Sequence, residues 1–165
     1  MKLLLMTLVE LLAIVGAVSA DEKKDTPKPE AKGALTIGDK THTFENALAY
    51  ETKKGTHRRT IVILTEKPLN TAKLKLSFEK NGNDEDFFAR VPHVKLSFDD
   101  RGGLVQTSIY ADGGNIGRSG DPNVKATATI KDGSAKGKAG MLKPDEAFGK
   151  VFTFEVTFDV KLMTP

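Results

Sequence analysis

The segment VFTFEVTFDVKL, residues 151–162, alternates apolar and polar side chains along its length. Phe152, Phe154, Val156, Phe158, Val160 and Leu162 take every second position, and five of the six intervening residues are polar. A helix would spread these apolar side chains around its circumference, whereas a β-strand places all of them on one face. Three of the nine phenylalanines lie here. The pattern therefore predicts a long strand at the centre of a sheet.

Other segments show the same period of two, which is typical of half-buried strands. Gly-Asp at 38–39 and Asp-Gly at 132–133 are dipeptides suited to tight hairpins. Residues 59–65, RTIVILT, are β-branched and mostly apolar, which predicts a strand that is covered on both faces. The remaining predicted strands are 34–37, 40–51, 94–98, 104–110, 124–130 and 134–139.

The stretch KLKLSFEK at 73–80 fits two structures. Its alternation favours a strand over 73–79, and Lys75–Glu79 resembles the predicted strand Lys95–Asp99. The same region also contains good helix formers, so a helix remains the alternative. Asn83-Asp84-Glu85-Asp86 resembles a cap and acidic first turn, which predicts a short helix over 84–90 that Pro92 ends.

Together these segments predict an all-β fold. We expect an antiparallel β-sandwich or a small barrel of seven to nine strands, with at most one or two short helices. The hydrophobic pattern does not separate a sandwich from a barrel.

The first twenty residues predict a signal peptide. Lys2 precedes an apolar run that ends at Val18-Ser19-Ala20, which favours cleavage after Ala20. Glu10 departs from this pattern, and an uncleaved short anchor is the alternative. Residues 21–32, DEKKDTPKPEAK, predict a disordered polar tether, and the β-domain is expected over 33–165. The mature chain is then periplasmic or extracellular, and it meets a membrane only through its signal peptide.

Composition excludes several classes of site. The chain of 165 residues has no cysteine, which rules out disulfides and thiolate metal sites. It has no tryptophan, and its formal net charge is only +3, which does not indicate a nucleic-acid binder. No nucleophile motif for hydrolysis is present, so the sequence leans away from an enzyme. We expect no cofactor.

One basic cluster is the leading candidate for a binding site. It comprises Lys53, Lys54, His57, Arg58 and Arg59, between two predicted strands. Such a loop could hold a phosphate, a lipid headgroup or an acidic glycan. The alternative is a solvated hairpin loop whose charges keep a sheet edge from pairing.

Metal sites are weaker candidates. Asp112, Asn115 and Asp121 lie in a glycine-rich stretch that we interpret as a long loop, and their oxygens could bind calcium. Their spacing matches neither the EF-hand nor the glycine-rich calcium repeat. His42, His57 and His93 lie in separate segments without the spacing of metal ligands.

Two structural motifs carry a resemblance to known proteins. They are the turn Leu64-Thr65-Glu66-Lys67-Pro68-Leu69 and the alternating strand Phe152–Phe158. With the leader and tether, the chain resembles small secreted bacterial β-domain proteins that have no assigned activity. The resemblance implies an exported β-domain and transfers no functional residue.

The leading hypothesis is an exported non-enzymatic β-domain that binds an anionic envelope component or a small ligand. A barrel-type carrier is one alternative, in which an apolar ligand lies among Phe44, Phe78, Phe98, Phe154 and Phe158. A hydrolase is the other, using paired carboxylates from Asp84, Glu85, Asp86, Asp99 and Asp100. These carboxylates lie in polar turns by prediction, where both members of a pair would stay ionised.

Overall fold

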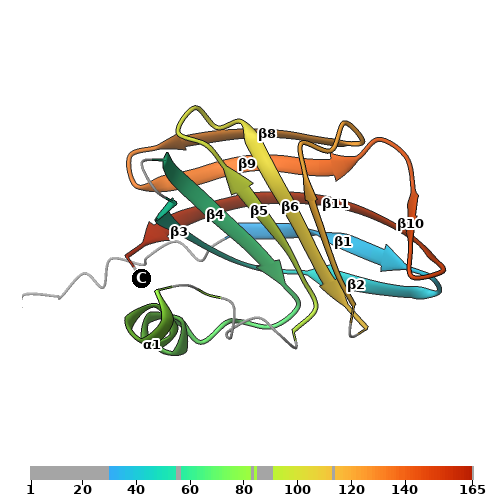
Figure 1. Ribbon diagram of the computed structural model, residues 1–165, viewed down its shortest axis with the longest axis horizontal. Helices are drawn as coiled ribbons and strands as arrows, with labels where there is room; N and C mark the ends of the chain where they lie inside the picture. Colours follow the sequence, from blue (N-terminus) through green and yellow to red (C-terminus); the bar gives the residue numbers. More distant parts are fainter. Residues whose placement is uncertain (1–29, 55–56, 83, 85–90, 113, 165) are drawn as a thin grey trace, which may run out of the picture.

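The computed structural model describes residues 30–54, 57–82, 84, 91–112 and 114–164. In this part of the chain it has eleven strands and one helix (Figure 1). The elements are β1 (Glu30–Ile37), β2 (Lys40–Phe44), β3 (Asn46–Lys54), β4 (His57–Thr65), α1 (Thr71–Asn81), β5 (His93–Phe98), β6 (Leu104–Ala111), β7 (Gly114–Ser119), β8 (Val124–Lys131), β9 (Ser134–Met141), β10 (Asp145–Ala147) and β11 (Lys150–Met163).

The all-β prediction is confirmed, but the predicted number of strands is too low. The strands form one open sheet in the order β2-β1-β11-β3-β4-β5-β6-β7, with β9 and β10 also paired to β11 and β8 paired to β9. The sheet is mixed and not purely antiparallel, because β11 pairs in parallel with β3 at Leu162↔Ala49 and Met163↔Tyr50. We call β1, β2 and β8–β11 the first half, and β3–β7 the second half.

The two halves cross over each other and enclose a common core (Figure 1). β11 contributes Phe152, Phe154, Val156, Phe158 and Val160, all of them buried. The opposing half contributes Val62 and Leu64 from β4 and Val94, Leu96 and Phe98 from β5. The predicted long central strand is therefore confirmed, since β11 pairs with four other strands.

The predicted hairpins are also present. Ile37 pairs with Lys40 across Gly38-Asp39, and Lys131 pairs with Ser134 across Asp132-Gly133. Asp132 and Gly133 have φ values of 51° and 69°, the left-handed conformation that both central residues of a type I′ hairpin turn require. The segment predicted as one strand over 40–51 is divided at Glu45 into β2 and β3, which belong to different halves.

The strand predicted over 73–79 is wrong, because this stretch lies in helix α1. The Asn70 side chain accepts a hydrogen bond from the Lys73 backbone at the N-terminus, and left-handed Gly82 closes the C-terminus through the Phe78 carbonyl. Leu74 is buried against Tyr50, Ile61 and Ile63. α1 thus covers the outer face of β4, which is buried on both faces as predicted.

The first strand, β1, begins within the segment 21–32 that the sequence predicts to be a tether. Residues 30–32, the end of the predicted tether, belong to β1 and pair with β11, and Ala31 is buried. The leader, the rest of the tether and most of the helix predicted over 84–90 lie outside the described residues. Among the residues that are described, no helix is long and apolar enough to cross a membrane.

Candidate functional site

The predicted basic cluster lies at the end of the β3–β4 hairpin. Its residues lie mainly within the strands and not in a loop, with Lys53 opposite Arg58 and Lys54 opposite His57. Lys53, His57 and Arg58 are exposed, whereas the Lys54 side chain is outside the described part. Strand alternation directs Arg59 to the opposite face of the sheet from Arg58. The structure therefore divides the cluster between two faces.

Lys53 and Arg58 line a groove of about 670 Å³, which we call the hairpin groove. Its walls come from the β3–β4 hairpin, the β8–β9 turn and the end of β11. Ile130, Leu162 and Met163 supply apolar surface. The other lining residues are Glu51, Thr52, Thr60, Asp100, Lys131, Asp132, Gly133 and Thr164. The sequence predicted two of the groove's cations but not Lys131, which the fold brings in from a hairpin distant in sequence.

The groove carries three cations and three carboxylates. The Arg58 Nη1 to Glu51 Oε1 distance is 3.8 Å, and the Lys131 Nζ to Asp132 Oδ2 distance is 3.7 Å. Both ion pairs are solvent-exposed and long, so each contributes little, on the order of 0–1 kcal/mol. Lys53 has no carboxylate within ion-pair distance among the described residues. An incoming anion can therefore compete for all three cations.

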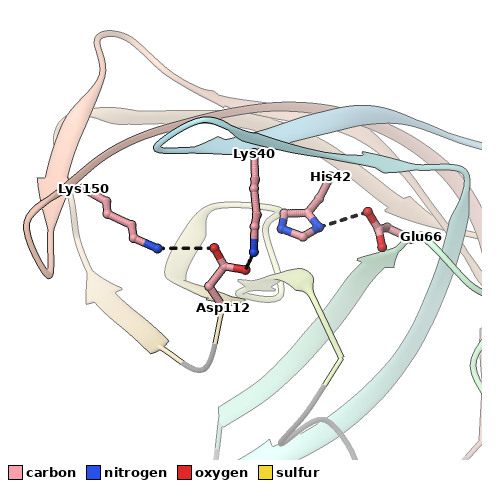
Figure 2. Close-up of polar contacts among 5 residues, drawn as sticks. All are labelled: Lys40, His42, Glu66, Asp112 and Lys150. Carbon is pink, nitrogen blue, oxygen red and sulfur yellow. Dashed lines mark hydrogen bonds and ion pairs between the residues drawn. The ribbon is translucent and has the colours of Figure 1, made fainter.

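A second polar cluster joins the two halves at the far end of the molecule (Figure 2). Asp112, in the β6–β7 turn, accepts hydrogen bonds from Lys40 Nζ at 2.9 Å and from Lys150 Nζ at 3.4 Å. The hydrogen bond from Lys40 is the main cause that lowers the pKa of Asp112. Nearby, His42 Nδ1 lies 3.0 Å from Glu66 Oε1. We call Lys40, Lys150 and Asp112 the rim bridge.

The three calcium candidates are not gathered into one site. Their glycine-rich stretch is a strand, β7, and not the long loop expected, so Asp112 and Asp121 lie beyond its opposite ends, about 20 Å apart. Asp112 is bound by two ammonium groups, Asn115 accepts a hydrogen bond from Ser108, and Asp121 lies 3.7 Å from Arg118. No group of three possible metal ligands, histidines included, occurs among the described residues.

A buried polar cluster lies near α1, and the sequence did not predict it. Asp84 accepts hydrogen bonds from the Tyr50 hydroxyl and from Lys95 Nζ, the latter at 2.5 Å. Burial, reinforced by the Asp84 charge, raises the pKa of Tyr50, so Tyr50 stays protonated and donates. Asp84 is only 7% exposed, contrary to the polar turn expected for it. Its contacts join Asp84 to β3, through Tyr50, and to β5, through Lys95.

His93 lies beside this cluster. Its Nδ1 donates to the Val91 carbonyl at 2.6 Å, and its ring stacks on Tyr110 with centroids 5.8 Å apart. Burial is the main cause that lowers the pKa of His93, which favours the neutral ring. These two contacts hold the His93 ring in place.

The other carboxylates proposed for hydrolysis have separate surroundings. Asp99 accepts hydrogen bonds from the backbone N–H groups of Arg101 and Gly103, and these bonds close the β5–β6 turn. Asp100 lines the hairpin groove, while Glu85 and Asp86 are outside the described residues. The phenylalanines proposed to line a carrier cavity are also divided. Four of them belong to the common core, namely Phe44, Phe98, Phe154 and Phe158. Phe78 lies on α1 and packs against the smaller cluster between α1 and the sheet.

No protein-family model matches the chain, and comparison with curated proteins finds no significant relative.

Proposed function

We propose that the chain is an exported, non-enzymatic binding module whose hairpin groove takes an anionic ligand with an apolar part, free or as a group on an envelope component. The observation that carries this proposal is the position of Lys53 and Arg58 beside Ile130, Leu162 and Met163. The groove's volume of about 670 Å³ lies within the usual range for small-ligand sites. Lys131 adds a third cation from the opposite wall.

We also propose that the chain folds as a β-sandwich and is exported. A sandwich is favoured over a barrel because the strand path remains open at β2 and β7 while both halves contribute to one packed core.

The apolar leader with its Val18-Ser19-Ala20 site supports export, to the periplasm or beyond. Protein recovered from the exported fraction should have an intact mass that begins at Asp21.

The binding proposal is tested with octyl phosphate as the anionic probe and octyltrimethylammonium as its cationic counterpart. We expect octyl phosphate to shift the NMR resonances of Ile130, Leu162 and Met163 in a saturable manner. The double variant Lys53→Ser/Arg58→Ser should weaken this binding about tenfold, the effect of losing roughly 1.4 kcal/mol of charge-assisted contacts.

The matched control is Lys73→Ser/Lys75→Ser, which removes the same charge from exposed positions on α1. It should bind octyl phosphate like the unaltered chain. Equal binding by the groove variant, or equal binding of the cationic probe, would overturn the proposal.

A further inference from the structure

The outer face of the first half is rich in lysine. β8, β9, β11 and β1 lie side by side in this order (Figure 1). Alternate residues of each strand enter the core, so the intervening residues point outward. The outward positions include six lysines, namely Lys32, Lys125, Lys131, Lys136, Lys138 and Lys161. We call this surface the lysine face.

The lysine face has an excess of positive charge. Its outward carboxylates are Glu30, Glu155 and Asp159, half the number of its lysines. All six lysines are exposed. Lys136 binds Asp159 at 2.7 Å, and Lys131 approaches Asp132 in the adjoining turn at 3.7 Å. The other four have no carboxylate within 4.0 Å among the described residues.

The cations are arranged in regular rows. Register places Lys138 and Lys32 on either side of Thr157, and Lys131 and Lys161 on either side of Ser134. Each pair is separated by two strand spacings, about 9.5 Å. Lys32, Lys136 and Lys138 also line a hollow of about 530 Å³, together with Thr127, Thr157 and the carboxylates Glu30 and Asp159. Hydroxyl groups therefore lie between the ammonium groups.

We propose that the lysine face binds a linear anionic polysaccharide, at a site that meets the hairpin groove only at Lys131. A linear polymer whose charges recur at about 1 nm or less can contact both lysines of a pair, because the two lysines are about 9.5 Å apart. Threonine hydroxyls between the lysines can donate to and accept from sugar hydroxyls.

Two other anionic partners fit this face less well. Single-stranded nucleic acid binds through base stacking on aromatic side chains, and no outward position of these four strands is aromatic. A lipid surface is engaged by exposed apolar side chains in addition to charge. On this face the exposed large apolar residue is Val151, at one end of β11 and away from the lysine rows.

The test measures affinity for polygalacturonate by isothermal titration, with neutral dextran as the uncharged control. The triple variant Lys32→Ser/Lys125→Ser/Lys138→Ser should bind polygalacturonate about tenfold more weakly, because it loses three exposed charge contacts. The control variant Lys73→Ser/Lys75→Ser/Lys80→Ser removes the same charge from α1. It should retain the affinity of the unaltered chain, and binding should weaken as salt is added.

The outcomes separate this site from the hairpin groove. The groove variant Lys53→Ser/Arg58→Ser should keep the affinity of the unaltered chain for polygalacturonate. If this variant loses only its binding of octyl phosphate, the two ligands use different sites. An equal loss in both triple variants would overturn the proposal, because it would reflect net charge. Binding to vesicles of equal parts phosphatidylglycerol and phosphatidylcholine, without binding to polygalacturonate, would overturn the polysaccharide assignment.

Discussion

Leu74 and Leu76 distinguish the helix α1 from the strand that its sequence suggests. In a strand the two leucines would share one face, whereas in the helix they point in different directions. Leu74 is fully buried against Tyr50, Ile61 and Ile63, while Leu76 is 47% exposed. Leu74→Ala and Leu76→Ala are therefore chemically identical changes at positions of opposite burial.

Leu74→Ala should lower the free energy of unfolding by about 3 kcal/mol. Buried leucine-to-alanine changes cost roughly 2.7–5 kcal/mol, from lost transfer free energy and the cavity left behind. We place Leu74 near the lower end because α1 lies at the surface and can settle into the space. Leu76→Ala should cost less than about 1 kcal/mol, since half of its side chain is already in water.

Urea unfolding followed by far-UV circular dichroism measures the difference. With an m-value of about 2 kcal/mol/M, the midpoint should fall by about 1.5 M for Leu74→Ala and by less than 0.5 M for Leu76→Ala. Equal shifts for the two variants would refute the helix and its packing on β4. A changed m-value would show that more than this contact was altered.

Two further predictions concern a tight strand contact and a buried histidine. Alanine at Gly137 would place its Cβ against the Thr127 carbonyl oxygen and 2.8 Å from Phe158 Cζ. Gly137→Ala should therefore lower the free energy of unfolding, measured with urea, by about 1–3 kcal/mol. Gly117→Ala is the control and should be nearly neutral, because open space surrounds Gly117. Burial lowers the pKa of His93 below its usual 6.5, with Lys95 lowering it further and Asp84 opposing the shift. Below pH 6.5 the unfolded state therefore takes up a proton that the folded state does not, and stability should fall as pH falls. His93→Asn should show a shallower decline between pH 7 and 5, and an identical pH profile would contradict the argument.

The strands that the sequence predicted well have strict alternation and clear turn residues. β11, β8 and β9 were recognisable because each puts small or apolar side chains on one face and polar ones on the other. β7 was missed because its residues, GNIGRS, carry no such period and contain two glycines. Its strand conformation depends on pairing with β6, which a local pattern does not contain.

Helix α1 was misjudged because two signals conflicted. Alternating Leu74, Leu76 and Phe78 suggested a strand, while the evidence for a helix was in its caps, Asn70 and Gly82. Both capping residues lie outside the alternating stretch 73–80, and the outer face of β4 gives Leu74 of the helix a surface to pack on.

The candidate sites show the same limit. Lys53 and Arg58 were identifiable as a dense run of charge, but their partner Lys131 was not, because only the fold brings it near. The polar neighbours of Asp84 in the sequence predict that its side chain is exposed to solvent. Its burial depends on Tyr50 and Lys95, which lie on two different strands. The lysine face combines residues from the first and last strands, so no local window reveals it.

The position of β11 has a consequence for how the chain folds. Among the described strands β11 is the furthest along the sequence, yet it pairs with β1, the first, and a hydrogen bond joins Thr157 to Lys32 across 125 residues. Contacts so distant along the chain slow folding, because a large loop must close before they form. Until residues 150–163 are available, β1 and β9 lack their common partner and the two halves lack their junction with β3. The sheet therefore cannot be completed before β11 is available, however early the other ten strands are ready to pair.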